Sequence, residues 1–439
     1  MSSEWLDLPL GEILTLQRGH DLPSQSRLPG DIPVMGSSGI TGFHNVAKST
    51  GPGVTVGRSG NSMGEISYSA TDFWPLNTAL YVTDFKGNDP KFVYYLLTTV
   101  NFDQFNSGSA QKSLNRNAVY PFEVRIPTSV KEQRRISAVL SALEDKVATN
   151  HQINQTLEQM AQAIFKSWFV DFEPVTAKIA ALEAGGSEED ALLAAMQAIS
   201  GTTLFDANAS AASAAEQLAR LQAERPEQYA ELRTTAELFP SAMQDSELGE
   251  IPEGWDIQQI GEILDRLKPK KRYTKKQVTP TGQTPVFEQG SDILLGFHNG
   301  IPGFIATSED PAFIFGDHTC IIHLSCQNFD VSQNVIPLKG KVRSTMWTYY
   351  ALQGKQTFQE YRRHWAELVV KPVIYPPNAL CKQFSETINS SIRLKEQLDQ
   401  EAKSLSEIRD LLLPKLLSGQ LSVSGTANCV PEVEEVTDV

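Results

Sequence analysis

Residues 131–171 have the sequence KEQRRISAVLSALEDKVATNHQINQTLEQMAQAIFKSWFVD, which contains neither proline nor glycine. Pro127 and Pro174 bracket this run, so we expect one long helix between them. A seven-residue repeat predicts a narrow apolar stripe along the helix, suited to a single partner helix. One repeat position holds Ile136, Leu143, Asn150, Leu157 and Ile164, and the position three residues later holds Val139, Ile153 and Met160. Asn150 is the kind of polar residue that fixes the register of a helix pair.

A second run without proline or glycine begins at Lys382 and continues to Pro414, with Gly419 just beyond. Apolar residues recur along this run at a similar spacing, at Leu394, Leu398, Leu405, Ile408 and Leu412. We therefore expect a second long helix, over residues 382–417, that packs against the first.

Length and composition indicate a globular protein with several domains. The chain has 439 residues, 41% of them apolar and 21% charged, which is enough for two or more separate cores. The start of the sequence shows no secretory signal, and no apolar run is long enough to span a membrane. The four cysteines form no CxxC pair. These features predict a cytoplasmic protein with free thiols.

The net charge of −14 is unevenly distributed along the chain. Residues 173–250 hold four basic and fourteen acidic side chains, and the last twenty residues hold four acidic side chains and no basic one. These two segments account for the whole net charge, so the remainder of the chain is neutral overall. A local basic surface is therefore compatible with the acidic total, and DNA is not excluded as a partner.

An internal repeat with a period near 250 residues organises the chain. The tetrapeptide GEIL occurs at residues 11–14 and again at 261–264, and GFHN occurs at 42–45 and at 296–299. Paired tyrosines at 94–95 are matched at 349–350, and a proline precedes each long helix, at Pro127 and Pro377. Several matches in one order at nearly constant offset indicate two copies of a globular domain followed by a long helix.

Each globular copy mixes short strand-like runs with turns rich in Gly, Ser and Asn, so we predict an α+β fold. Two pseudo-symmetric globular domains would be separated by two long antiparallel helices that form a coiled coil. The predicted parts are a first domain (1–130), a first helix (131–172), an acidic Ala-rich helical insertion (173–250), a second domain (251–380), a second helix (381–419) and an acidic tail (420–439). The insertion is either a connector between the copies or a docking surface for another subunit.

The residues and spacings that most enzyme active sites require are missing from the sequence. It has no phosphate-binding loop ending in Gly-Lys-Ser/Thr, no GxGxxG and no HExxH. His318, Cys320, His323 and Cys326 form the one metal-like cluster, but strand alternation would place His318 and His323 on opposite faces. We therefore predict no catalytic residue and no metal site.

A basic run at residues 268–276 is the first candidate for binding. It carries Lys268, Lys270, Lys271, Arg272, Lys275 and Lys276, with Tyr273 among them. Lys and Arg side chains that neutralise phosphates supply most of the affinity of proteins for DNA. A charge run is often only solvated surface, but in a chain otherwise so acidic it favours a phosphate contact. Lys270, Lys271, Arg272 and Lys275 are the residues that we assign to DNA.

Polar loops are the second candidate. Residues 57–61 (GRSGN) follow a strand-like run, and such a loop is either a tight turn or a site that brings Arg58, Ser59 or Asn61 to DNA. Residues 107–112 form another polar loop, with Ser109, Gln111 and Lys112. At the equivalent place in the second copy stand Arg362, Arg363 and His364, and His318 follows the second copy's strand. The different side chains suggest two related surfaces that read different targets.

The chain resembles the DNA-specificity subunits of type I restriction–modification systems over nearly its whole length. The resemblance rests on Trp5 with Leu10–Ile13 (LGEI), on residues 249–255 (GEIPEGW), and on the 57–60 and 108–111 loops. Residues 131–136 (KEQRRI) match the start of the family's helix well, whereas residues 381–384 keep only part of it. The second copy also departs from the family pattern at residues 316–318 and 362–365.

The resemblance implies a non-catalytic subunit whose two domains each read one half of a split DNA site. The two helices would hold two methyltransferase subunits, which bind S-adenosylmethionine, and through them nuclease and translocase subunits that use ATP and Mg. This chain itself would bind no cofactor. The aromatic residues Phe165, Trp168 and Phe169, at the end of the first helix, are candidates for contacting the methyltransferases.

The predicted helices would also act as a ruler. About 35 helical residues span roughly 50 Å. Since base pairs are spaced by roughly 3.4 Å, this permits two half-sites about one turn of DNA apart. Inserting four residues in the first helix would add roughly 6 Å and lengthen the gap by one or two base pairs.

Two alternatives remain open from the sequence. The chain could be a two-headed coiled-coil scaffold that binds proteins rather than DNA. It could also serve a modification-only or phage-defence complex that lacks a nuclease.

Overall fold

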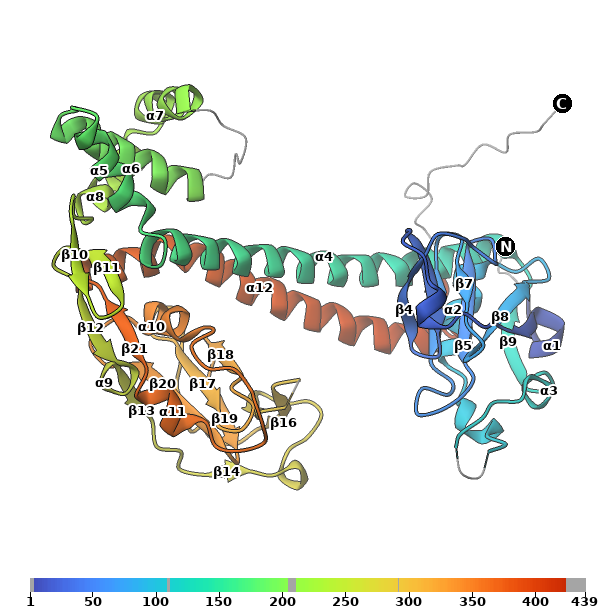
Figure 1. The fold of residues 1–439 in the computed structure, drawn as a ribbon. Helices are drawn as coiled ribbons and strands as arrows, with labels where there is room; N and C mark the ends of the chain where they lie inside the picture. The colour runs from blue at the N-terminus through green and yellow to red at the C-terminus, as the bar shows by residue number, and fades with distance from the viewer. Residues whose placement is uncertain (1–3, 109–110, 204–210, 291, 424–439) are drawn as a thin grey trace. The chain divides into compact units, whose positions relative to one another are not determined.

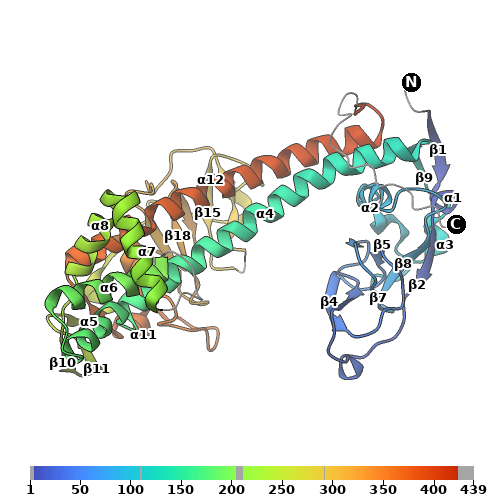
Figure 2. The ribbon, with the colours of Figure 1, turned by 90° about the horizontal axis from the view of Figure 1, so that it is seen from above.

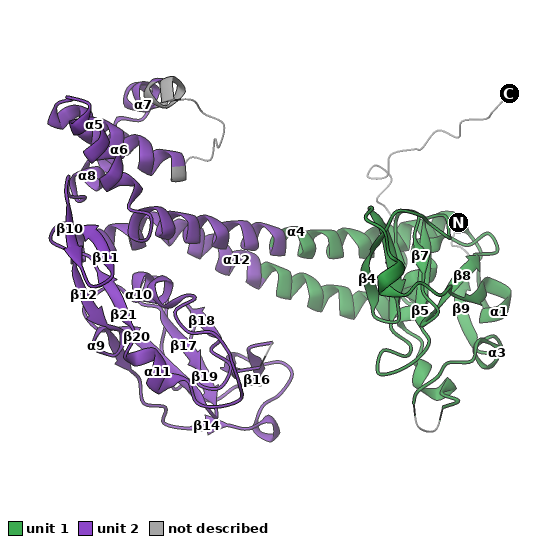
Figure 3. Ribbon diagram, in the orientation of Figure 1, with its two compact units in different colours: residues 1–150, 401–439 green, residues 151–400 purple. Residues whose placement is uncertain are grey.

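The computed structural model describes residues 4–108, 111–203, 211–290 and 292–423. The chain forms two compact units, residues 1–150 with 401–439 and residues 151–400 (Figure 3). The predicted acidic tail lies largely outside the described residues. Among the residues that the structure describes, no helix is both long and apolar enough to cross a membrane.

The first unit contains three small sheets. Strands β1 (Trp5–Pro9) and β9 (Glu123–Pro127) pair antiparallel, so the two ends of the domain meet just before the long helix. A four-stranded sheet has the order β2-β8-β5-β6, and a three-stranded sheet has the order β4-β3-β7. These strands are β2 (Thr15–Arg18), β8 (Ala79–Asp84), β5 (Gly53–Gly57), β6 (Ile66–Ser69), β4 (Gly39–His44), β3 (Ile32–Gly36) and β7 (Trp74–Pro75). Short helices α1 (Leu10–Ile13), α2 (Pro90–Thr98) and α3 (Arg116–Val119) complete the domain.

The second unit repeats this topology. Its four-stranded sheet has the order β13-β20-β17-β18, and a second sheet has the order β14-β19-β15-β16. The strands are β13 (Leu264–Arg266), β20 (Val335–Gly340), β17 (Ala312–Gly316), β18 (Ile322–Ser325), β14 (Arg272–Tyr273), β19 (Asp330–Ser332), β15 (Thr284–Phe287) and β16 (Leu294–His298). The pair β12 (Asp256–Gln259) and β21 (Pro372–Tyr375) matches β1 and β9, and α9 (Ile260–Ile263), α10 (Thr345–Leu352) and α11 (Trp365–Val369) match α1, α2 and α3. The α+β fold and the internal repeat predicted from the sequence are both present.

Two helices run well beyond the sheets. Helix α4 (Val130–Phe169) follows β9, and α12 (Asn378–Leu417) follows β21, close to the predicted spans (Figure 1). In the first unit the start of α4 lies against the end of α12, because Ile136, Leu140, Leu416 and Leu417 share one apolar core. In the second unit the end of α4 lies against the start of α12, so the helices are antiparallel, side by side in both views (Figure 2).

The start of α4 is tied to the first domain through the buried amide of Gln133. Its Nε2 donates to Asn88 Oδ1 at 2.8 Å and to the Pro127 carbonyl at 3.0 Å. Its Oε1 accepts from the Asp89 amide at 2.9 Å. Asp89 in turn caps α2 by accepting from the Phe92 amide at 2.9 Å. One side chain therefore fixes where the helix leaves the domain.

The seam of the helix pair differs in phase from the predicted one. In the structure, the first repeat position (Ile136, Leu143, Asn150, Leu157 and Ile164) is accompanied in the seam by the position four residues later. That position holds the buried or half-buried residues Leu140, Val147, Asn154, Ala161 and Trp168. Ile153 is 37% exposed, so assigning it to the seam was wrong. On α12, Leu394 and Ile408 are likewise exposed, at 42% and 45%. Apolar residues stand at both the third and the fourth position of several repeats, so the pattern alone does not select the phase.

The 173–250 segment consists mainly of four helices in the second unit. They are α5 (Glu173–Glu183), α6 (Glu188–Thr203), α7 (Ala211–Glu224) and α8 (Pro226–Glu237), and the hairpin β10 (Met243–Ser246) and β11 (Gly249–Pro252) follows them. Val175, Met196 and Ala236 join the same core as Trp168 at the end of α4. The buried Lys178 Nζ donates to the Phe239 carbonyl at 2.6 Å. The insertion is therefore built into the core of the second unit.

Candidate nucleic-acid interface

Two loops of the first unit come together at the end of β5. The loop that begins at Gly57 lies beside the loop of residues 106–114, since Ser59 and Ser113 form a β-bridge. The Leu114 amide donates to the Arg58 carbonyl at 2.8 Å, and the Gly60 amide donates to the Lys112 carbonyl at 3.0 Å. The structure thus brings together Arg58, Ser59, Asn61, Gln111 and Lys112, which the sequence analysis had placed on two separate loops. Ser109 lies outside the described residues.

Glycine is required where the first loop begins. A Cβ on Gly57 would lie 1.9 Å from the Ser62 carbonyl oxygen and 2.5 Å from the Ser37 carbonyl oxygen. Gly108 is equally confined, because its Cβ would lie 1.9 Å from the Gln111 carbonyl oxygen. Both loops therefore fold back tightly on their own backbone, and this fixes the direction in which their polar side chains leave.

The side chains on this loop pair are only lightly engaged within the protein. Asn61 and Gln111 are exposed, and Arg58 is half-buried, with its Nη1 donating to the Asn77 carbonyl at a long 3.4 Å. Lys112 pairs with Asp103 at 2.6 Å on the exposed surface, where such a pair contributes little to stability. Amide and guanidinium groups in this position can hydrogen-bond the edges of bases.

The second unit has the same backbone arrangement at the end of β17. The Asp317 amide donates to the Asn334 carbonyl at 2.9 Å, just as the Arg58 amide donates to the Thr78 carbonyl at 2.9 Å. The His364 amide donates to the Asp317 carbonyl at 2.8 Å, which matches the bond from Leu114 to Arg58. Asp317 therefore stands where Arg58 stands in the first unit.

The second loop pair corrects several predicted DNA contacts. His364 is fully buried, with Nε2 3.0 Å from the Glu360 carbonyl oxygen, so its role is structural. The guanidinium of Arg362 is occupied by Glu360, at 2.8 Å, and by Glu367. The ring of His318 packs edge-on against Tyr361, and both its ring nitrogens are buried, so it too is withdrawn from solvent. Burial removes His364 and His318 from any phosphate or base, whereas Arg362 is exposed and its contact with DNA stays a prediction.

Arg363 is exposed, so its contact with DNA stays a prediction. Its side chain is 77% exposed, and its Nε lies 3.8 Å from Asp317. The carboxylate of Asp317 instead accepts from the amides of His364 and Trp365, at 3.2 Å and 3.0 Å. An acidic side chain therefore holds the loop, which presents the guanidinium of Arg363 with little engagement inside the protein.

The basic run divides into exposed lysines and one engaged arginine. Lys268, Lys270, Lys271, Lys275 and Lys276 are exposed. Arg272 donates to the carbonyls of Ser332 and Val335, at 2.7 Å and 2.8 Å, and is half-buried. Burial, and then the charge of Arg266, lower the pKa of Arg272. The assignment of Arg272 to DNA is corrected, because its guanidinium anchors β14 to the loop after β19.

A buried cluster that the sequence reasoning missed supports this run. Lys271 Nζ lies 4.1 Å above the Tyr273 ring, and that ring stacks on His298 at 4.6 Å with an angle of 11°. His298 Nδ1 accepts from the Gly300 amide at 3.0 Å, so Nε2 carries the proton that it donates to Asp330 at 2.9 Å. The repeated GFHN motif, which contains His298, is the sequence signal that could have pointed to it.

The predicted partner-binding aromatics are also corrected. Trp168 is 0% exposed and lies edge-on to Phe239, with the ring centroids 5.5 Å apart. Phe169 is buried against Trp255 and Phe384, and Phe165 packs against Phe384 at 5.6 Å. Trp168 and Phe169 belong to the core of the second unit, so their rings are not available to another subunit, whereas Phe165 is half-buried at the edge of that core.

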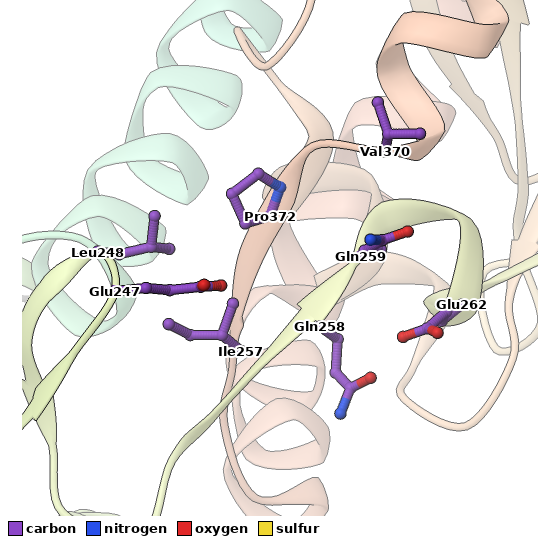
Figure 4. A pocket seen from close by; sticks show the side chains of 8 residues that line it. All are labelled: Glu247, Leu248, Ile257, Gln258, Gln259, Glu262, Val370 and Pro372. Atoms are coloured by element: carbon purple, nitrogen blue, oxygen red, sulfur yellow. The ribbon is translucent and has the colours of Figure 1, made fainter.

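A shallow pocket of about 500 Å³ in the second unit has the wrong character for DNA (Figure 4). It lies between β12, the turn before β11 and the end of α11, and Glu247 and Glu262 line it. Its other lining residues are Leu248, Ile257, Gln258, Gln259, Val370 and Pro372. Two carboxylates without a lysine or arginine would repel phosphate.

Comparison with known proteins shows which proteins this chain resembles. Residues 2–159 match the family model described as the type I restriction modification DNA specificity domain. The type I restriction enzyme HindI specificity subunit of Haemophilus influenzae is 29% identical over 386 residues, covering 76% of this chain and 77% of that protein. The type I restriction enzyme EcoprrI specificity subunit of Escherichia coli is 25% identical over 140 residues, 31% of this chain and 35% of that protein.

A solved structure shares the fold. The crystal structure of the type I restriction-modification system S subunit from M. genitalium superposes with a TM-score of 0.53 at 14% identity, covering 94% of this chain and 96% of that chain. At this identity the likeness concerns the fold alone, and it agrees with the α+β prediction. The sequence relatives are named as specificity subunits of type I restriction enzymes. Over most of its length this chain is similar to a specificity subunit of a type I restriction–modification system, and residues 2–159 match the DNA specificity domain of that family.

Proposed function

We propose that this subunit reads a bipartite DNA site, with one half recognised by each unit. The observation that carries the proposal is the repeated loop pair, which follows β5 in the first unit and β17 in the second with matching backbone hydrogen bonds. The two loop pairs have one frame and different side chains. A shared protein backbone arrangement with different side chains suits two DNA half-sites that have the same sugar-phosphate backbone and different bases.

The accessible side chains of the two loop pairs differ, which supports recognition of different bases by the two units. The first loop pair offers Arg58, Asn61 and Gln111, whose guanidinium and amide groups match the edges of guanine and adenine. The second offers Arg363 as the exposed guanidinium of its loop. We assign base recognition to these four side chains.

Phosphate contact falls to the exposed lysines of the second unit. Lys268, Lys270, Lys271, Lys275 and Lys276 project from one short segment around β14. Five ammonium groups so close together would displace several counterions from the DNA backbone, which is the main sequence-independent source of affinity. The acidic total of the chain does not oppose this, since the acidic excess lies in residues 173–250 and the tail.

The remaining parts of the proposal concern the complex. Two methyltransferase subunits that bind S-adenosylmethionine would associate with this chain, and nuclease and translocase subunits that use ATP and Mg would join through them. The complex would act on DNA in the cytoplasm. Since the aromatic end of α4 is buried, the contact with the methyltransferases must lie on other surfaces.

Mapping of modified bases tests the proposal. The chain is expressed with its cognate methyltransferase, random-sequence DNA is exposed to the complex, and methylated positions are read by sequencing. A single motif of two short specified parts separated by unspecified bases is the expected result. A continuous motif would overturn the two-unit reading, and no DNA methylation or binding at all would favour a protein-interaction scaffold.

Single-unit variants sharpen the test. Gln111→Ala should relax specificity in one half of the motif and leave the other half unchanged, and Arg363→Ala should do the reverse. Gln104, an exposed glutamine outside the loop pair, gives the matched control Gln104→Ala. A change in both halves from either variant would contradict the assignment of one half to each unit.

A further inference from the structure

The α4–α12 seam contains polar pairs that join unlike residues. In the first unit, Asn150 Nδ2 donates to Glu401 Oε2 at 2.8 Å, and Lys146 lies 3.6 Å from the same carboxylate. Glu144 pairs with Arg409 at 3.7 Å. Each pair takes one partner from each helix.

The second unit continues the pattern. Asn154 Nδ2 donates to Asp399 Oδ1 at 2.6 Å, and Lys395 pairs with Glu158 at 2.9 Å. Burial alone would raise the pKa of Glu158, but Lys395 and neighbouring hydrogen bonds outweigh it, so the pKa is lowered and the pair is charged. Half-buried polar groups of this kind are costly when they lose their partners.

The two helices are equivalent copies with an offset of 248 residues. Val130 and Phe169 bound α4, and Asn378 and Leu417 bound α12 at the same spacing. Burial follows the same offset, since the buried residues Ile136, Leu140, Trp168 and Phe169 correspond to the buried residues Phe384, Ile388, Leu416 and Leu417. Two copies of one helix could therefore in principle pair with each other in the same antiparallel geometry.

Such a like-with-like pair would keep none of the polar pairs described above. The α4 residues that correspond to Glu401, Asp399, Lys395 and Arg409 are Ile153, His151, Val147 and Ala161. In an α4–α4 pair, Asn150 would meet Ile153 and Glu158 would meet Val147. In an α12–α12 pair, Glu401 would meet Leu398, the counterpart of Asn150. Each like pair would set charged or amide groups against apolar side chains.

The side chains at the ends of the helices also favour the unlike α4–α12 pair over a like pair. Trp168 and Phe169 fill the core of the second unit, whereas their counterparts Leu416 and Leu417 fill the core of the first. An α4–α4 pair would require the larger aromatic side chains to enter a core built for two leucines. Overfilled cores are destabilised.

We propose that the polar residues of the α4–α12 seam select the unlike pairing, so that each half of this chain associates with the other half and not with a second copy of itself. The interaction surface of α4 is thus fitted to one partner, a helix with acidic groups at the positions of Asp399 and Glu401. This inference concerns assembly of the chain and does not depend on DNA recognition.

A nicked protein tests the proposal. A protease site is inserted beside the exposed Val170, between α4 and α5, so that residues 173–250 stay with the second domain, and the folded full-length chain is cut into an N-terminal and a C-terminal piece. Mild urea then permits exchange, and native mass spectrometry counts the three possible dimers after its removal. The expected product is the unlike dimer almost alone. Like and unlike dimers in the proportions of random pairing would overturn the proposal.

Ile153→Glu supplies the decisive variant. Ile153 is exposed, so the folded chain should tolerate the change, which melting of the uncut variant verifies. In an α4–α4 pair the new carboxylate would meet Asn150, and the proportion of the N-terminal like dimer should rise several-fold. Gln152→Glu adds the same charge at an exposed neighbouring position and should behave as the unmodified protein does. If Ile153→Glu leaves the like dimer as rare as in that control, the polar seam is not what selects the partner.

Discussion

Arg272 and its lysine neighbours show how differently adjacent cations can be used. All lie in one basic run, yet the guanidinium is held by two backbone carbonyls while the lysines are exposed. The sequence predicted the run as a whole. It could not separate its members, because the carbonyls that hold Arg272 belong to residues some sixty positions away.

The exposed lysines should govern affinity without governing sequence. The triple variant Lys270→Ala, Lys271→Ala, Lys275→Ala should weaken DNA binding by the reconstituted complex about equally for all sequences. The slope of log affinity against log salt should fall by about one for each phosphate that a lysine no longer neutralises. Titrations at several salt concentrations measure it, with Lys382→Ala as a control at an exposed position of α12. An unchanged slope would show that these lysines do not contact DNA phosphates.

Arg272→Ala should act on stability instead. Its removal leaves the Ser332 and Val335 carbonyls without this donor, at a cost of about 1–3 kcal/mol in the free energy of unfolding. Chemical denaturation of the isolated chain measures the loss. A variant with native stability and a reduced salt slope would restore Arg272 to the DNA contacts.

The sequence also could not show that distant residues bury His364 and Trp168. Histidine beside two arginines is typical of a nucleic-acid surface, and aromatics at a helix end are typical of a docking surface. Both are buried, because Glu360 folds back over the histidine and the second unit's core closes over the tryptophan. In contrast, Arg58, Asn61 and Gln111 remain accessible on one loop pair, since local glycines fix those loops.

At the scale of elements, both long helices and the strand pattern could be predicted from breakers and periodicity. The phase of the seam could not. Val139 and Leu140 are adjacent and both apolar, so the repeat admits two stripes, and only packing against α12 selects the one through Leu140 and Asn154.

Asn154 and Asp399 should be energetically coupled. Asn154→Ala should lower the free energy of unfolding by about 1–2 kcal/mol, because the hydrogen bond to Asp399 is removed from the half-buried seam. Combined with Asp399→Ala, the effect should be smaller than the sum of the two single changes. Gln152→Ala, at an exposed position two residues away, is the control. Strict additivity of the two changes would contradict a direct contact.

Trp168→Ala distinguishes a core residue from a docking residue. Emptying a fully buried indole site should cost about 3–5 kcal/mol of stability, measured by denaturation without any partner present. Val170→Ala, at the exposed position two residues later, should have little effect. Native stability combined with loss of methyltransferase binding would contradict the burial of Trp168 described above.

At the scale of the whole molecule, the repeat was the most informative feature of the sequence. The motif offsets predicted two copies, and the strand orders β2-β8-β5-β6 and β13-β20-β17-β18 match one for one. The role of residues 173–250 could not be predicted in this way, because that segment has no counterpart in the other copy. Its packing depends on Trp168 and Phe239, which its composition does not reveal.

The proposed spacer function has a test that preserves the seam. Seven residues inserted in α4 beside Asn150, and seven in α12 beside Glu401, keep the heptad phase and lengthen both helices by about 10 Å. The gap in the methylated motif should grow by about three base pairs, with the specified bases unchanged. Insertion in α4 alone is the control and should destabilise the pair. An unchanged gap in a folded double variant would refute the ruler idea.

The joint contribution of Ile136, Leu140, Leu416 and Leu417 to one core also has a consequence in time. The first unit combines residues 1–150 with the described residues 401–423, so the ribosome must add about 250 residues before it can close. At ~5–20 residues per second this wait lasts roughly 12–50 s, and during it α12 does not yet cover the apolar face of the nascent α4. A stop codon between positions 401 and 416 would therefore damage the domain that was translated first.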